Sequence, residues 1–265
     1  MKKVILVTLA WLLLSAMPAL GASKAAPKTT GGVGYEAGGL QRHIEFNAQQ
    51  LTDVCNVNLD GNWTISFTSS VWSGSPFMHN WNVTGDTLNG TSTGNSYTAT
   101  IEIVGKNVTI EATYRVGSAA YPYTYTASGT INPDGSLSGT WSDTKYSDKG
   151  TWSSTSGSAI IEGCSGKGML NYKDANGDSY KVDIQYVKVE GEDAWFAGPV
   201  VSASNPSWLS YWLFAKVHDG CEPAVGVDQV SGSFTNENSA KLGVALMSNP
   251  GSGPFTVTSG NLQVH

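Results

Sequence analysis

The residues of this 265-residue chain that could recognise a ligand are mostly aromatic. Nine Trp, eleven Tyr and seven Phe residues are present, and many of them stand at alternate positions between Gly61 and Ser154. Aromatic side chains bind apolar molecules by burial and stack on rings or sugars. The pattern therefore predicts non-covalent binding, in which no bond is made or broken. The residues that we expect to contact the ligand are Trp63, Trp72, Trp81, Tyr97, Tyr114 and Trp141.

Polar residues that could perform catalysis or bind a metal do not fall into a motif with the required spacing. The four histidines are scattered, and Asp174–Asp178 lacks the later Gly and Glu of a calcium-binding loop, so Asn176-Gly177 is better explained as a hairpin turn. Glu102 and Glu111 resemble a glycosidase pair, but alternation places both on an outer face among threonines. A Gly-x-Ser-x-Gly motif is missing. We therefore expect no catalytic residue, no metal site and no cofactor.

The aromatic residues are positioned by strands in which almost every second residue is apolar. Tyr97–Val104 and Asn107–Tyr114 flank a Gly105-Lys106 turn, and folding at this two-residue loop brings Ile101 opposite Ile110. The apolar residues of both strands then share one face, and a slip of one residue would expose them. The pattern predicts an antiparallel sheet that is buried on one face and hydrated on the other.

About eight strands of this kind follow one another between Gly61 and Ser154, separated by turn residues. Such a meander loses its exposed edges when it closes into an up-and-down barrel. An eight-stranded barrel is either filled by its side chains or holds one small ligand. Small inward residues such as Gly90, Ala99 and Gly129 favour a cavity, whereas the many inward aromatic residues favour a filled interior. Both interpretations stay open here.

The segments on either side of this barrel predict a second, discontinuous β domain. Residues 31–54 hold about two strands, too few to bury a core, and residues 158–265 hold longer strands of mixed character. We expect these segments to form one β-sandwich, with the barrel of residues 55–157 inserted between them. The fold class is therefore all-β: an eight-stranded antiparallel up-and-down barrel inserted in a discontinuous β-sandwich. The aromatic residues assigned to the sandwich core are Trp208, Tyr211, Trp212 and Phe214.

The three cysteines support the insertion. Cys55 precedes the first strand of the barrel and Cys164 follows the last one, so both stand at the stems of the insertion. The ends of a meandering eight-stranded barrel lie close together, and an oxidising compartment allows a disulfide there. We expect the Cys55–Cys164 pairing and leave the two other pairings as alternatives, with Cys221 either free or bonded to another molecule.

The N-terminal residues predict export. Two lysines precede an apolar stretch over residues 4–14, and small residues follow, which is typical of a signal peptide over residues 1–21. Residues 22–30 carry no pattern, and we expect a disordered leader there. Loss of the two lysines leaves 13 basic and 21 acidic residues, a formal charge of −8, which argues against nucleic acid as a partner. We expect a monomer without membrane insertion that is secreted or lies in the periplasm or at the cell surface.

From Gly61-Asn-Trp63 onward the chain resembles the calycins, the lipocalin-type and avidin-type barrels whose first strand carries a Gly-x-Trp motif. The resemblance covers residues 59–155 and implies a barrel with an open end. The C-terminal helix and the late Arg of lipocalins have no clear counterpart here. The flanking part is similar to a β-sandwich of uncharacterised secreted bacterial proteins, and this second resemblance implies no function.

The leading hypothesis is a secreted, non-enzymatic binding protein that holds a small apolar or aromatic ligand, or a sugar, in the barrel mouth. The alternative is a structural module of the cell surface or the extracellular matrix, with a filled barrel and with protein or polysaccharide partners. A cavity in the barrel separates these two hypotheses. An enzyme would require a polar constellation inside the barrel, where alternation predicts almost no polar residue.

Overall fold

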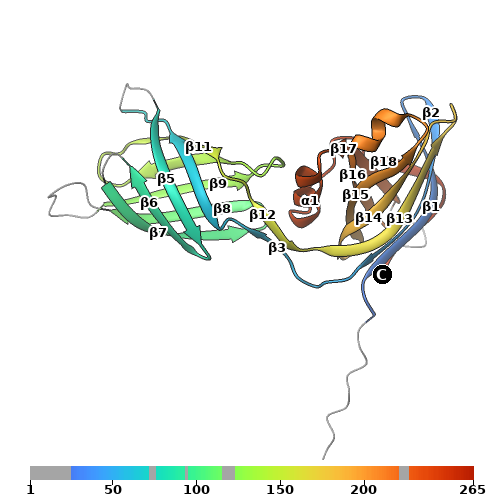
Figure 1. Cartoon of the computed structure of the whole chain (residues 1–265), viewed down its shortest axis with the longest axis horizontal. Coiled ribbons are helices and arrows are strands. Elements are labelled where there is room, and N and C mark those ends of the chain that lie inside the picture. The colour runs from blue at the N-terminus through green and yellow to red at the C-terminus, as the bar shows by residue number, and fades with distance from the viewer. Residues whose placement is uncertain (1–24, 72–75, 93–94, 115–122, 221–226) are drawn as a thin grey trace, which may run out of the picture.

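The described residues form two closed β-barrels joined by a narrow neck (Figure 1). The computed structural model describes residues 25–71, 76–92, 95–114, 123–220 and 227–265. Both barrels have eight antiparallel strands, which confirms the all-β class and the predicted antiparallel barrel. Within these ranges no helix is long and apolar enough to cross a membrane.

The first of them, here called the inserted barrel, is a meander whose last strand pairs with its first strand. The hairpin around Gly105 has the predicted register, with Ile101 opposite Ile110 and Ala99 opposite Ala112. These four side chains are buried because they occupy the inward face. The strands are β4 (Gly61–Phe67), β5 (Phe77–Thr84), β6 (Thr87–Ser92), β7 (Asn95–Val104), β8 (Asn107–Tyr114), β9 (Tyr123–Ile131), β10 (Leu137–Asp143) and β11 (Lys149–Ser156).

The second, here called the discontinuous barrel, is built from the segments that precede and follow the inserted barrel. β1 (Lys28–Ala37) pairs with β2 (Leu40–Gln50) on one side and with β18 (Phe255–Val264) on the other, and this pairing closes the sheet. The other strands, in spatial order from β2, are β13 (Ser165–Asp174), β14 (Ser179–Glu190), β15 (Asp193–Ala203), β16 (Trp212–His218) and β17 (Gln229–Thr235).

The predicted β-sandwich is therefore wrong, and a closed barrel takes its place. Alternation of apolar residues shows which face of a strand is buried, but it does not show which strand lies beside the first one. The long-range pairing of β1 with β18 decides between the two architectures. β1 also begins at Lys28, so residues 28–30 belong to the barrel wall and not to a disordered leader.

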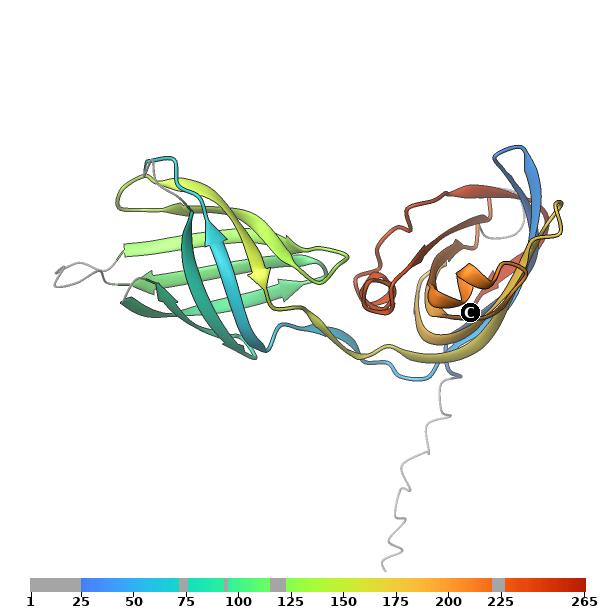
Figure 2. The same ribbon diagram turned by 45° about the horizontal axis from the view of Figure 1, so that its top comes forward.

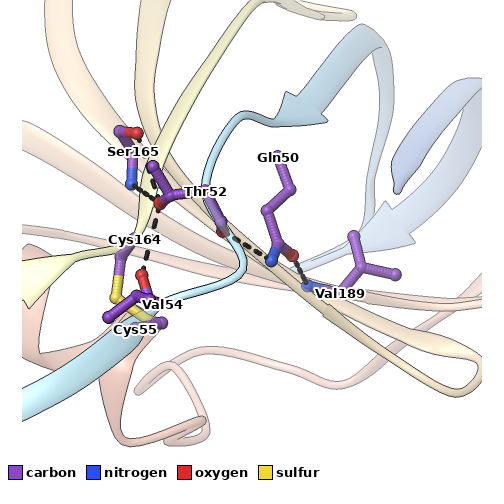
Figure 3. Close-up of a disulfide and its surroundings, with 7 residues drawn as sticks. All are labelled: Gln50, Thr52, Val54, Cys55, Cys164, Ser165 and Val189. Atoms are coloured by element: carbon purple, nitrogen blue, oxygen red, sulfur yellow. Dashed lines mark hydrogen bonds between the residues drawn. A yellow bond between two sulfur atoms is a disulfide. The ribbon is translucent and has the colours of Figure 1, made fainter. Parts of the chain in front are cut away.

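The neck is a two-stranded ladder with a disulfide at its end (Figure 3). β3 (Cys55–Asn58) leads the chain into the inserted barrel, and β12 (Ile160–Gly163) leads it back. Cys55 and Cys164 are bonded as predicted, and the Cys164 amide donates a hydrogen bond to the Val54 carbonyl at 2.8 Å. Cys221 lies outside the described residues.

Side chains at the stem connect this disulfide to the wall of the discontinuous barrel (Figure 3). The Ser165 amide donates to Thr52 Oγ1 at 3.1 Å, and that hydroxyl donates to the Val54 carbonyl at 3.2 Å. The buried Gln50 side chain donates to the Thr52 carbonyl at 2.8 Å and accepts from the Val189 amide at 2.9 Å. These bonds fix the direction in which the insertion leaves the barrel.

A helix that the sequence analysis did not predict, α1 (Glu237–Ala245), lies on the side of the discontinuous barrel that faces the inserted barrel (Figure 2). Asn236 begins it as an N-cap, since its side-chain oxygen accepts a hydrogen bond from the Ser239 amide at 2.9 Å. Asn236 before a short run containing Ala, Leu and Val was the signal available in the sequence.

The helix α1 is buried against both barrels. Leu242 and Leu246 belong to the apolar core of the inserted barrel. Ala240 and Val244 pack instead with Phe214 on the outer wall of the discontinuous barrel. α1 therefore covers the end of the inserted barrel that faces the neck and holds the two barrels together.

Removal of the disulfide by the double substitution Cys55→Ser, Cys164→Ser is expected to lower the free energy of unfolding by about 2–4 kcal/mol. The physical reason is that the bond joins residues 109 positions apart and so restricts the unfolded chain. Urea unfolding followed by tryptophan fluorescence measures the change. Cys221→Ser is the matched control and should keep the parent midpoint; an equal fall in both variants would contradict the prediction.

Candidate functional site

Four of the six predicted ligand contacts lie buried inside the inserted barrel. The tryptophans among them use their ring nitrogens within the protein: Trp63 Nε1 donates to the Leu59 carbonyl at 2.7 Å. Trp72 lies outside the described residues, as does the side chain of Tyr114. The four buried residues, with exposed fractions between 1% and 9%, are Trp63, Trp81, Tyr97 and Trp141.

Small inward residues of the inserted barrel make room for aromatic rings. A methyl group at Gly90 would lie 2.2 Å from the Tyr97 ring, and one at Gly129 would lie 2.5 Å from the Trp152 ring. Ala99 is itself buried and belongs to the same core. The volume that these residues leave inside the barrel is thus occupied by the Tyr97 and Trp152 side chains.

A polar cluster lies among these rings. His79 Nδ1 is 2.6 Å from the Tyr97 hydroxyl, which also accepts a hydrogen bond from Trp81 Nε1 at 2.7 Å. The Tyr125 hydroxyl donates to the same oxygen at 3.5 Å. The sequence analysis missed His79, although this residue precedes Trp81 by two positions in β5 and therefore shares its inward face.

Burial sets the ionisation of the cluster. It lowers the pKa of His79 to about 4 and raises the pKa of Tyr97 to about 12, because desolvation disfavours either charged form. Hydrogen bonds from Tyr125 and Trp81 partly offset the rise of the Tyr97 pKa. Both groups are neutral at pH 7 and satisfy one another, so they can fix the packing of the interior without a buried charge.

A cavity of about 380 Å³ opens at one end of the discontinuous barrel. It lies where the β1–β2 and β13–β14 hairpins turn, beside the short 3₁₀ helix η1 (Pro206–Ser210). Small-molecule sites in proteins have volumes of about 300–1,000 Å³. The aromatic residues of the cavity wall are Tyr35, Tyr172, Tyr180, Trp208, Phe234 and Phe255.

Contacts between these rings hold them in fixed orientations. The rings of Tyr172 and Tyr180 stack with centroids 4.4 Å apart, and Phe234 meets Tyr180 edge-on at 5.1 Å. Tyr35 stacks on Phe255 at 5.4 Å. Tyr35 and Tyr172 are buried, whereas Phe234 is 37% exposed, so the cavity has a deep end and an open rim.

Strand register and a capped turn bring these side chains together. Tyr35 lies opposite Arg42 in the β1–β2 ladder, and Arg42 lies opposite Asp174 in the β2–β13 ladder. Asn205 starts η1 by accepting a hydrogen bond from the Ser207 amide at 3.0 Å. That turn places the Trp208 ring 5.8 Å from the Tyr180 ring.

Arg42 is the only cation in the cavity wall among the residues that the structure describes. Its guanidinium lies close enough to the Tyr35 hydroxyl to lower the pKa of that group, while its Nε atom is buried without a hydrogen-bond partner among the described residues. Burial raises the pKa of Tyr35 and, to about 12, the pKa of Tyr172, and the Arg42 charge opposes both shifts. The tyrosine hydroxyls therefore stay protonated at neutral pH, and the Tyr172 hydroxyl donates a hydrogen bond to Asp174 Oδ2 at 3.5 Å.

The Asp174 carboxylate forms no ion pair with Arg42, although the two residues are cross-strand neighbours. Asp174 Oδ1 accepts hydrogen bonds from the Asn176 amide at 2.9 Å and the Asp178 amide at 3.0 Å. This confirms the hairpin turn at Asn176-Gly177.

Within the described part of the chain, no group of three or more His, Cys, Asp or Glu side chains is arranged to hold a metal ion.

No protein-family model, curated protein or solved structure matches this chain. Support for ligand binding by the cavity therefore comes from the geometry of the cavity alone.

The aromatic cluster that the sequence analysis assigned to one core is divided between three environments. Trp208 lines the cavity, and Tyr211 is 44% exposed. Trp212 and Phe214 lie on the outer wall of the discontinuous barrel, in the cluster covered by α1. Trp208 stands in η1 and Tyr211 is its C-cap, whereas Trp212 and Phe214 share the outward face of β16, so a single core was the wrong interpretation of this stretch.

A second cleft, of about 540 Å³, lies on the outer wall of the discontinuous barrel. Its charged residues neutralise one another: Asp193 bonds to Lys216 Nζ at 3.1 Å and to His218 Nδ1 at 2.9 Å. Lys216 also lies over the Trp195 ring. Because these charges are already paired, the cleft makes a weaker case for a ligand than the cavity with Arg42.

Folding stability is expected to fall as the pH drops from about 6.5 to about 4. In this range the unfolded chain takes up a proton at His79 and the folded barrel does not. The free energy of unfolding therefore falls by on the order of 3 kcal/mol between these two pH values. Above about pH 6.5 the neutral His79 makes its full contribution to stability. Urea unfolding at a series of pH values measures it. His79→Gln should lose this part of the pH dependence, whereas His43→Gln, at an exposed histidine, should keep it. Identical profiles for both variants would refute the assignment.

Proposed function

We propose that this chain is an extracellular, non-enzymatic binding protein that holds a small apolar or aromatic ligand in the mouth of the discontinuous barrel. The observation that carries the proposal is the cavity of about 380 Å³, walled by stacked aromatic rings on paired strands. Such rings offer a large apolar surface at a low cost in side-chain entropy. Rigid strands position them more accurately than loops do.

The proposal moves the binding site away from the six residues predicted in the inserted barrel. Binding there stays a prediction, and the close packing of Tyr97 against Gly90 and of Trp152 against Gly129 is the reason to prefer the other barrel. A filled interior favours a structural role for the inserted barrel, as a calycin-like module that presents its outer surface to protein or polysaccharide partners. This is the second candidate function, and the first does not exclude it.

The predicted signal peptide and the disulfide both support an extracellular place of action. The signal-peptide pattern of residues 1–21 predicts secretion, and a disulfide between Cys55 and Cys164 is typical of an oxidising compartment. A sugar is the other class of ligand named in the sequence analysis. The stacked walls of the cavity, with Trp208 at its rim, favour a flat apolar molecule over a polyol.

Titration with the neutral dye N-phenyl-1-naphthylamine tests the proposal. We expect saturable fluorescence enhancement and a raised melting temperature, because a ligand that binds only the native state stabilises it. Trp208→Ala should weaken binding at least about tenfold, since it removes a wall of the cavity.

Tyr146→Ala is the matched control, because it removes an aromatic ring that is 54% exposed on the inserted barrel. It should bind the dye as the parent does. Loss of binding in Trp141→Ala together with retention in Trp208→Ala, both checked for native circular dichroism, would place the site in the inserted barrel and overturn the proposal.

A further inference from the structure

We infer that the ligand of this cavity carries a carboxylate, which pairs with the guanidinium of Arg42. The inference rests on the proposed function and names the chemical class of its ligand. It begins from the position of Arg42, which projects from the inward face of β2 in line with Ile44 and Phe46 and lines the cavity beside Tyr35.

The guanidinium has bonding capacity that the protein leaves unused. Arg42 Nε is buried and lacks a hydrogen-bond partner among the described residues. A buried donor without an acceptor is unfavourable, and native proteins rarely keep one. Because Nε is closed to solvent, a ligand in the cavity would reach the guanidinium through its terminal nitrogens.

Among the described residues, Arg42 also lacks a direct carboxylate partner. Across the described ranges, no Asp or Glu oxygen lies within the 4.0 Å of an ion pair with this residue. The two carboxylates of the cavity wall are engaged at the β13–β14 turn: Asp174 binds two backbone amides, and Asp178 accepts a hydrogen bond from Ser204 Oγ at 3.2 Å. An arginine fork binds a carboxylate through two parallel hydrogen bonds, which makes an organic acid the matching partner.

The same two aspartates argue for a single negative charge on the ligand. Asp174 and Asp178 both line the cavity, so a dianionic phosphate would meet stronger repulsion than a carboxylate would. The protonated hydroxyl of Tyr35, which lies opposite Arg42 in the β1–β2 ladder and lines the same cavity, can donate a hydrogen bond to the bound anion. The stacked rings of Tyr172 and Tyr180 then face the body of the ligand, which we assign as aromatic or short-chain aliphatic.

A pair of isosteric probes tests the inference: 2-naphthoate, which is an anion at pH 7, and 2-naphthamide, which is neutral. Isothermal titration of the full chain with each probe gives the ratio of their dissociation constants. We expect the naphthoate to bind about 10- to 100-fold more tightly than the amide, the range of a charged hydrogen bond. Arg42→Gln should bring this ratio close to one, and Arg42→Lys should retain part of the preference.

Lys173→Gln is the matched control, because it removes the same charge from an exposed position on β13, one residue from Asp174. It should leave the ratio as it is in the parent. An equal loss of preference in Lys173→Gln and Arg42→Gln would show a general effect of charge and overturn the pairing. Thermal melts of each variant establish that the barrel is folded.

The neutral dye separates failure of this inference from failure of the proposed function. Equal binding of naphthoate and naphthamide by a protein that also binds N-phenyl-1-naphthylamine would refute the carboxylate and leave the binding cavity standing. No binding of any of the three probes would refute both proposals.

Discussion

The pairing of β1 with β18 is the interaction on which the rest of the structure depends. It joins the first and last strands of the described chain, with Thr30 opposite Gln263 and Val33 opposite Gly260, and so converts eight strands into a barrel with an interior. The stacking of Tyr35 on Phe255 crosses this seam. The cavity wall is therefore complete only when the chain has returned from the inserted barrel. The disulfide at the neck holds the outgoing and returning segments of the chain side by side.

The two barrels share an architecture and differ in how their interiors are filled. In the inserted barrel, glycines on one strand face large rings on the next, as Gly90 faces Tyr97, so small and large residues complement each other. In the discontinuous barrel, rings gather at one end beside small residues such as Ala215, Gly232 and Ser233, and a cavity remains there. α1 contributes apolar residues to the core of the first barrel and to the outer wall of the second, which couples their stability.

Local features of this fold could be predicted from the sequence, and long-range features could not. The register of Ile101 with Ile110 follows from alternation and a two-residue turn, both of which lie within a few residues. The Cys55–Cys164 bond could be predicted because one cysteine precedes the first strand of the inserted barrel and the other follows its last strand. Closure through β1 and β18 leaves no local pattern, and a sandwich has the same alternation. Arg42 and His79 were missed for another reason: each stands on an inward face by strict alternation, but a polar residue at such a position is usually read as pointing outward.

The two interiors differ in whether their polar groups find hydrogen-bond partners within the protein, and this difference distinguishes a packed core from a binding site. In the inserted barrel, His79, Trp81 and Tyr97 satisfy one another at 2.6–2.7 Å, and burial keeps the histidine neutral, so nothing from outside is required. In the discontinuous barrel, the buried Nε atom of Arg42 has no acceptor among the described residues, and no described Asp or Glu oxygen forms an ion pair with its guanidinium. A cation without a directly paired carboxylate among the described residues favours an external anion, and the open rim at Phe234 leaves a path for one to enter.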